Sequence, residues 1–223
     1  MQAVAYFAPH SMANLAADII VVSRKLSAAE VSSIFPGKNC QLVTATGNVP
    51  SQAGLVLMAD EWEGEALQIP ENDSSLWLIA STCFTLSEIN LQHAGVARIC
   101  GWKGWLQSKT WEVALPKEGD ITHWKAALDK MGKSPVWVPD IIGLIAPATV
   151  ARLVNEAWYV WKNEVSSREE IDLAMRLGTN YPKGPLAWGK EIGLQNIAFL
   201  LQKMELASAD VQPHEDLKNY LNY

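Results

Sequence analysis

Short apolar runs alternate with turn residues along the first part of the chain. Seven runs rich in Val, Ile and Leu have the length of β-strands: Val4–Ala8, Ile19–Val22, Gln41–Thr44, Leu55–Ala59, Leu76–Ala80, Ala97–Cys100 and Val136–Val138. Because they are continuously apolar, they predict strands of a sheet that is covered on both faces. Segments with helical spacing lie between them: Ser11–Ala17, Ser27–Ile34, Leu86–His93 and Ile121–Met131. This alternation predicts an α/β layer over residues 1–138.

The last part of the chain, residues 139–223, has the pattern of helices alone. In Ala148–Trp161, apolar residues recur on one broad helical face. Ser166 and Ser167 each stand three residues before a glutamate, so either can be the N-cap of the next helix. We expect Gly178 to end this helix and Gly184-Pro185 to begin the next one. Ile197–Met204 has the apolar spacing of a further helix, and Pro213 begins the last one. The sequence therefore predicts an α/β domain followed directly by an all-helical domain.

The composition of the chain argues against several classes of protein. Of the 223 residues, 49% are hydrophobic and 19% are charged, so the chain can form a packed core. The net charge of −6 argues against a nucleic-acid partner, since phosphate binders cluster Lys and Arg. The apolar runs are too short to span a bilayer, and the N-terminus lacks the basic region of a signal peptide. Three widely spaced cysteines, Cys40, Cys83 and Cys100, predict buried thiols in a reducing cytoplasm and no metal site.

Motifs in the helical part follow one another in a recognisable order: Leu153–Ala157, Ile171–Met175, Asn180–Pro185 and Ile192–Leu194. In sequence and spacing they resemble the C-terminal domain of the 3-hydroxyacyl-CoA dehydrogenase family. Weaker similarity extends upstream, to Ala53–Glu61, Ala80–Leu86, Ile99–Trp102 and Met131–Val138. The resemblance implies a shortened, degenerate Rossmann-like domain over residues 1–138 and a helical dimerisation domain over residues 139–223.

The resemblance also indicates where a nicotinamide cofactor would bind. The family has a Gly-x-Gly-x-x-Gly turn after the first strand, where backbone N–H groups approach the pyrophosphate. Here Ala8, His10 and Ala13 replace the three glycines. The carboxylate that binds the ribose aligns with Ser23, and we interpret the two cationic residues after it as solvated charges. We therefore expect neither NAD nor NADP to bind, unless the interpretation of this domain as degenerate is wrong.

The positions of the family's catalytic residues have also changed. Lys103 aligns with the histidine that serves as general acid and base, and Leu115 with the glutamate that orients it. Phe84 and Pro147 align with a serine and an asparagine near the substrate oxygen. Lys103 is a candidate base if its tryptophan neighbours desolvate it, and is otherwise an exposed or ion-paired lysine. The side chains expected around the cleft are Thr82, Phe84, Thr85, Trp102, Trp105 and Pro147.

These observations favour a catalytically degenerate family member that forms a homodimer through its C-terminal helices. An acyl-CoA-like small molecule in the cleft between the domains is the first ligand to consider. Two alternatives remain open. One is an active NAD(P)-dependent 3-hydroxyacyl-CoA dehydrogenase with a divergent site, and the other is a dimeric scaffold whose cleft is filled by Phe84, Trp102 and Trp105.

Overall fold

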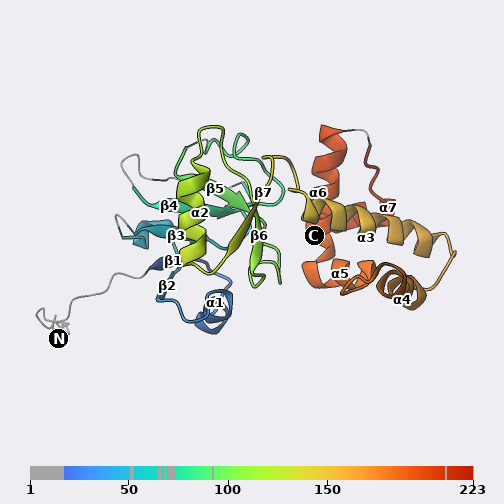
Figure 1. The fold of residues 1–223 in the computed structure, drawn as a ribbon. Helices are drawn as coiled ribbons and strands as arrows, with labels where there is room; N and C mark the ends of the chain where they lie inside the picture. Colours follow the sequence, from blue (N-terminus) through green and yellow to red (C-terminus); the bar gives the residue numbers. More distant parts are fainter. Residues whose placement is uncertain are drawn as a thin grey trace, which may run out of the picture.

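The structure is a computed structural model, and it describes residues 18–50, 53–64, 67, 69, 74–91, 93–208 and 210–222. They form an α/β half followed by an all-helical half, which confirms the predicted fold class (Figure 1). The predicted strand Val4–Ala8 and helix Ser11–Ala17 lie outside the described residues.

The main sheet has five parallel strands in the order β2-β1-β3-β4-β5. Their bounds are β1 (Ile19–Val22), β2 (Cys40–Val43), β3 (Leu55–Met58), β4 (Leu76–Ala80) and β5 (Val96–Ile99). All residues of β1, β4 and β5 are buried, which explains why these segments are apolar without alternation, apart from Arg98 of β5. The chain leaves β1 for the outer strand β2 and then returns to β3 on the other side of β1. The order of the described strands therefore reverses between β1 and β3.

The two faces of the sheet are covered differently. Helices α1 (Ala28–Ile34) and α2 (Ile121–Lys130) pack on one face, where Ile34 and Trp124 join a core with Val21 and Leu57. Figure 1 shows α2 lying across the strands. On the opposite face, Leu86 and Ile89 join Val56 and Trp77 in a second core. The residues that complete this face come mostly from loops rather than helices.

The expected helix Leu86–His93 is wrong, because this segment forms turns. Thr85 begins it, and the Glu88 carboxylate accepts hydrogen bonds from the Thr85 backbone N–H and hydroxyl. Asn90 then adopts a left-handed backbone, with φ of 55°. An Asn tolerates this conformation, which interrupts a right-handed helix. The apolar spacing that suggested a helix instead places Leu86 and Ile89 against the sheet.

A second sheet pairs β6 (Thr110–Val113) in parallel with β7 (Ser134–Trp137). The sequence did not predict β6, because Trp111 lies among lysines and polar residues. Only one face of β6 is fully covered: Trp111 and Val113 are buried, whereas Thr110 is exposed. An alternating strand of four residues gives a weak periodic signal.

The helical half contains α3 (Ala146–Lys162), α4 (Arg168–Thr179), α5 (Pro185–Ile192), α6 (Leu194–Ala207) and α7 (Glu215–Lys218). Ser167 is the N-cap of α4 and forms a capping box with Glu170, which decides between the two serines. Helix α4 continues past Gly178, its expected end, to Thr179, and Asn180 with left-handed backbone is its C-cap. Gly184 lies so close to α4 that a Cβ there would come within 2.2 Å of the Asp172 side chain.

Hydrogen bonds of Arg98 in β5 connect the end of the sheet to the segment that leads into α3. The Arg98 side chain is fully buried, and Nε donates to Asp140 Oδ1 at 2.7 Å. Its two terminal nitrogens donate to the carbonyls of Ser81 at 2.8 Å and Ile141 at 2.6 Å. The core of the helical half continues across this junction to Cys83, Cys100 and Trp102.

Candidate functional site

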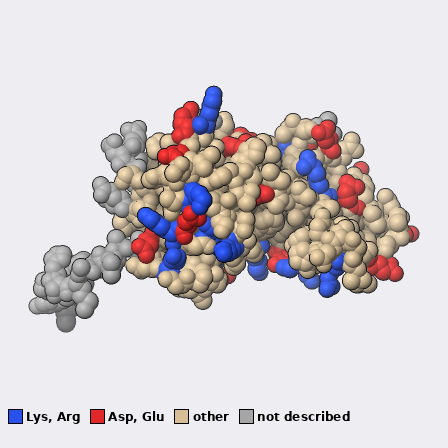
Figure 2. All heavy atoms as spheres, viewed as in Figure 1, with Lys and Arg blue, Asp and Glu red and all other residues tan. Residues whose placement is uncertain are grey.

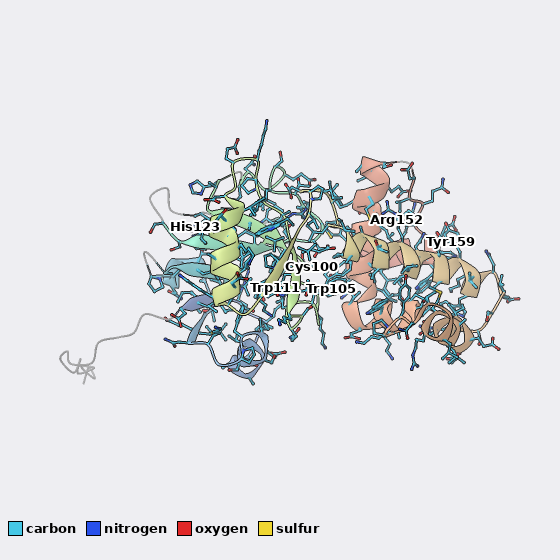
Figure 3. The ribbon with its side chains drawn as sticks, in the orientation of Figure 1. Cys100, Trp105, Trp111, His123, Arg152 and Tyr159 are labelled. Carbon is cyan, nitrogen blue, oxygen red and sulfur yellow. The ribbon has the colours of Figure 1, made fainter. Side chains whose placement is uncertain are left out.

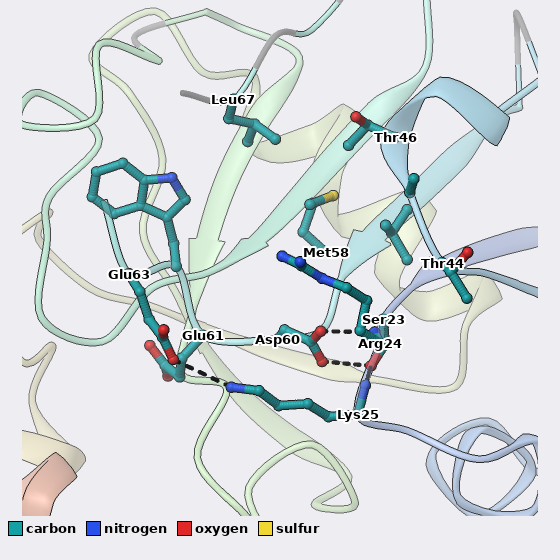
Figure 4. Close-up of a pocket in the computed structure, with 13 residues that line it drawn as sticks. Ser23, Arg24, Lys25, Thr44, Thr46, Met58, Asp60, Glu61, Glu63 and Leu67 are labelled. Carbon is teal, nitrogen blue, oxygen red and sulfur yellow. Dashed lines mark hydrogen bonds and ion pairs between the residues drawn. The ribbon is translucent and has the colours of Figure 1, made fainter. Parts of the chain in front are cut away.

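A pocket of about 680 Å³ opens at the carboxyl ends of β1, β2 and β3 (Figure 4). Its apolar wall includes Val22, Met58 and Trp62, and hydroxyls come from Thr44 and Thr46 beyond β2. The pocket lies where the strand order reverses, which is the usual ligand position in an open parallel sheet. Its volume lies in the range of small-molecule and cofactor sites.

The turn after β1 contributes Ser23, Arg24 and Lys25 to this pocket. Ser23 is buried and its hydroxyl donates to Asp60 Oδ1 at 2.5 Å, while the Arg24 backbone N–H donates to Asp60 Oδ2 at 2.8 Å. Lys25 forms an exposed ion pair with Glu63. The sequence alignment placed Ser23 after the second strand of the fold, at the ribose. In the described sheet it follows β1, next to the reversal point, and Thr44 follows the outer strand.

A polar cluster joins the ends of β3, β4 and β5 beside the pocket. The Glu61 carboxylate accepts hydrogen bonds from the Thr82 hydroxyl, from Thr82 N–H at 2.8 Å and from Gly101 N–H at 2.7 Å. Burial raises the pKa of Glu61, and these hydrogen bonds act in the opposite direction. The Thr82 hydroxyl also lies 3.3 Å from Cys100 Sγ. Burial raises the pKa of Cys100 well above its ordinary value, so this thiol is not a ready nucleophile.

Gly101 is needed for this arrangement. A Cβ at this position would lie 2.5 Å from the Ala80 Cβ and 3.1 Å from Glu61 Oε1. Our interpretation of the sequence missed Asp60 and Glu61 as site residues. The signal was present, since carboxylates directly follow the buried run of β3 and the carboxyl ends of parallel strands meet at one edge.

Lys103 lies apart from these groups. Its side chain is exposed, whereas its neighbour Trp102 is 2% exposed and points into the core of the junction. Trp102 and Trp105 pack edge to face at a centroid distance of 6.1 Å. The tryptophans therefore do not enclose the ammonium, and the hypothesis of a desolvated Lys103 base finds no support in this geometry.

The remaining residues predicted for the cleft fill space or cap turns. Phe84 packs edge to face against Trp62, at a centroid distance of 4.8 Å, and against Phe199 of α6. Pro147 is buried in the first turn of α3, and Thr85 caps the turn that contains Glu88. Only Thr82 belongs to the polar cluster at the strand ends. Ala8, His10 and Ala13 lie outside the described residues.

A smaller pocket, of about 250 Å³, lies where the β6–β7 pair meets α3. Cys100, Trp105, Trp111 and Val136 are among its lining residues. Figure 3 shows Cys100, Trp105 and Trp111 together near the junction of the two halves. The lining is mainly apolar, so this pocket fits a small hydrocarbon group better than a charged one.

Glu112, which lies three residues before the expected orienting position at Leu115, has a different role. Its carboxylate accepts hydrogen bonds from the backbone N–H groups of Ile145 and Ala146 at 3.0 Å, at the start of α3. Leu115, at the aligned position itself, packs against the core under α2. Figure 3 places His123 on α2, away from these groups.

On the face drawn in Figure 2, acidic and basic side chains are interspersed. Within the described residues, no helix is both long and apolar enough to cross a membrane.

Comparison with known proteins finds similar sequences for the helical half. Residues 143–222 match the profile of the 3-hydroxyacyl-CoA dehydrogenase C-terminal domain. The chain is 44% identical over 78 residues to 3-hydroxyadipyl-CoA dehydrogenase of Escherichia coli, a match that covers 35% of this chain and 16% of that protein. It is 35% identical over 82 residues to 3-hydroxybutyryl-CoA dehydrogenase of Clostridioides difficile, covering 37% of this chain and 29% of that protein. The chain thus spans less than a third of each of these two relatives.

Solved structures have a similar fold over most of the chain. FadB2 of Mycobacterium tuberculosis superimposes with a TM-score of 0.67 at 16% identity, over 82% of this chain and 70% of that one. The (S)-3-hydroxybutyryl-CoA dehydrogenase of Ralstonia eutropha gives a TM-score of 0.66 at 19% identity, with the same coverage. At these identities the likeness establishes the fold alone.

The comparisons correct one expectation. The matching relatives are hydroxyacyl-CoA dehydrogenases, and hydride transfer of that kind uses a nicotinamide cofactor. The prediction that no cofactor is involved is therefore wrong. It rested on residues 8–13, which lie outside the described structure, and gave no weight to the pocket beside β1. That pocket has the position and volume for a nucleotide, although the described turn after β1 contains no glycine.

Proposed function

Because residues 143–222 match the C-terminal domain of the 3-hydroxyacyl-CoA dehydrogenase family, we propose that this chain binds a nicotinamide nucleotide beside β1 but has lost the acid–base step. The observation that carries the binding proposal is the position of the 680 Å³ pocket at the reversal of strand order. Met58 and Trp62 would lie against a base, and Thr44 and Thr46 offer hydroxyls to a ribose. The bound nucleotide would supply the hydride chemistry.

The loss of the acid–base step is supported by the residues around Lys103. A general acid or base must reach the reacting proton, directly or through one water molecule. Lys103 is exposed, Glu112 binds the start of α3, and Leu115 has no titratable group. Glu61 lies where the ends of β3, β4 and β5 meet, but Thr82 and Gly101 already donate to both of its oxygens.

Two measurements test this function. Calorimetric titration of the purified chain with NADH should show one saturable site. With acetoacetyl-CoA present, NADH oxidation should stay at background, since loss of general acid–base catalysis costs about 10²–10⁴ in rate. The double variant Lys103→His with Leu115→Glu should not restore turnover. Absence of NADH binding would refute the binding proposal, and turnover at an ordinary enzyme rate that Lys103→Ala abolishes would refute the loss of the acid–base step.

An acyl group is a second ligand to consider, in the smaller pocket at the junction. Its apolar lining favours hydrocarbon, and its 250 Å³ suits a short acyl chain rather than a long one. Butyryl-CoA binding that is weakened by Val136→Asp, a substitution in the pocket lining, would support this assignment.

We also propose that the chain forms a homodimer through α4. Leu173 and Leu177 are 51% and 77% exposed and lie one turn apart on this helix. Glu169 and Arg176 flank them at spacings that share the same face. In an antiparallel pair of α4 helices centred near Leu173, this leucine would meet its copy, and each Glu169 would face Arg176 and Leu177 of the second copy. A two-fold interface must be self-complementary in this way.

The double variant Leu173→Glu with Leu177→Glu tests the dimer. In analytical ultracentrifugation at micromolar concentration, the unmodified chain should sediment as a dimer and the variant as a monomer. Leu206→Glu, which changes a leucine that is 80% exposed at the end of α6, is the matched control and should leave the dimer intact. A monomeric unmodified chain would contradict the proposal. The reducing cytoplasm stays a prediction, supported by the free thiols of Cys40, Cys83 and Cys100.

A further inference from the structure

The turn after β1 has its hydrogen-bond donors occupied by the protein itself. The Arg24 N–H donates to Asp60, and the Lys25 and Leu26 N–H groups donate to the Ser23 hydroxyl oxygen at 3.0 and 2.9 Å. The Ser27 N–H donates to the Glu30 carboxylate at 2.8 Å. Because this turn lines the pocket at the reversal of strand order, phosphates of a ligand bound there would approach its N–H groups. Here four consecutive N–H groups have acceptors from within the chain.

Among these acceptors, Asp60 has the position of a ligand anion. It belongs to the segment after β3, 37 residues from Ser23, and reaches across the reversal point to the turn. Its two oxygens accept from the Ser23 hydroxyl and the Arg24 N–H, as the oxygens of a phosphate would. Figure 4 shows both hydrogen bonds at the edge of the pocket.

We propose that Asp60 is a built-in anion that competes with the phosphates of a nucleotide for the turn after β1. The proposal rests on the proposed nucleotide site. Two negative groups cannot share the same donors without repulsion, and a charge that is partly shielded from water repels more strongly than an exposed one. A nucleotide must therefore displace Asp60 or place its phosphates outside the turn, beside Arg24 and Lys25. Asp60 thus lowers affinity for phosphates and favours ligands that place a neutral group at the turn.

The variant Asp60→Asn tests this role. The amide keeps the size of the side chain and one oxygen acceptor for the Arg24 N–H, but it removes the charge. Titration calorimetry with NADH, and separately with inorganic pyrophosphate, should show binding that is about tenfold tighter than in the unmodified chain. Glu63→Gln is the matched control, because it removes a carboxylate of the same pocket whose hydrogen bond goes to the Lys25 ammonium and not to a backbone N–H of the turn. It should change affinity by less than about threefold.

The outcomes separate the two proposals. If NADH binds the unmodified chain and Asp60→Asn equally well, Asp60 is not a competing anion and the nucleotide site stands. If Asp60→Asn and Glu63→Gln tighten binding equally, the effect belongs to the overall charge of the pocket and the specific role is refuted. If neither the unmodified chain nor Asp60→Asn binds either probe, both proposals fail. A thermal melt of each variant verifies that it is folded.

Discussion

Buried polar side chains are distributed unevenly between the two halves of the chain. In the described part of the helical half, Asn155 is buried; in the α/β half the buried polar residues are Ser23, Ser75, Ser81, Thr82, Arg98 and Lys133. The helical half is held mainly by apolar packing between amphipathic helices, together with helix caps. The α/β half also depends on polar contacts at the ends of its strands. The half with a clear sequence match is thus the one that buries fewer polar side chains.

The largest expected effect is on the α/β half, at Arg98. Arg98→Met removes the donors to Asp140, Ser81 and Ile141 and leaves these partly or fully buried acceptors without them. Removing one partner of a buried ion pair typically costs about 3–5 kcal/mol, so urea denaturation should show a loss of this size. Lys125→Met, which removes the exposed pair with Asp129, should cost less than about 0.5 kcal/mol. Equal losses in the two variants would mean that the buried contacts of Arg98 stabilise this half no more than an exposed ion pair does.

A smaller effect is expected in the helical half, at Asp172. Its carboxylate accepts the N–H groups of Leu186 and Ala187 at 2.8 and 2.9 Å and so caps α5 from α4. Asp172→Ala should lower the free energy of unfolding by about 1–2 kcal/mol, because those N–H groups lose their acceptor. Asp172→Asn keeps one oxygen and should lose less. If the asparagine variant were as unstable as the alanine variant, the capping role would be wrong.

The smallest effect concerns pH and Lys133. Burial lowers the pKa of Lys133 to about 8, although its ammonium donates to the carbonyls of Leu106 and Ser108 and lies 4.4 Å from the Trp111 ring centroid. The unfolded chain holds this proton up to about pH 10.4. Between about pH 8 and 10.4 the unfolded state therefore binds more protons, and stability should rise with pH.

Between pH 8 and pH 9 the contribution of Lys133 should be about 1 kcal/mol, since releasing one proton changes stability by up to about 1.4 kcal/mol per pH unit. Urea denaturation at pH 8 and pH 9 measures it, by comparing the unmodified chain with Lys133→Met. The variant should lack this part of the rise. A rise of the same size in both proteins would assign it to other groups.

The same contrast explains what the sequence could predict. The strands β1, β3 and β4 are recognisable because burial on both faces requires apolar residues at each position, and α4 because its capping box is local. The residues of the site were harder to predict from the sequence. The contact of Ser23 with Asp60 depends on which strands are neighbours, which no local pattern records. Lys103 illustrates the reverse error, because an aligned position does not show whether the side chain lies in a pocket.

The start of α3 carries a consequence for how the chain can be divided. This helix has no side-chain cap of its own, and the N–H groups of Ile145 and Ala146 are satisfied by Glu112 of β6. The cap of the longest helix in the C-terminal domain is therefore supplied by a residue of the other half. A fragment cut at residue 139 would leave these groups to water and fray at its first turn. Recombination that joins this domain to a different α/β half must also supply an acid at this junction.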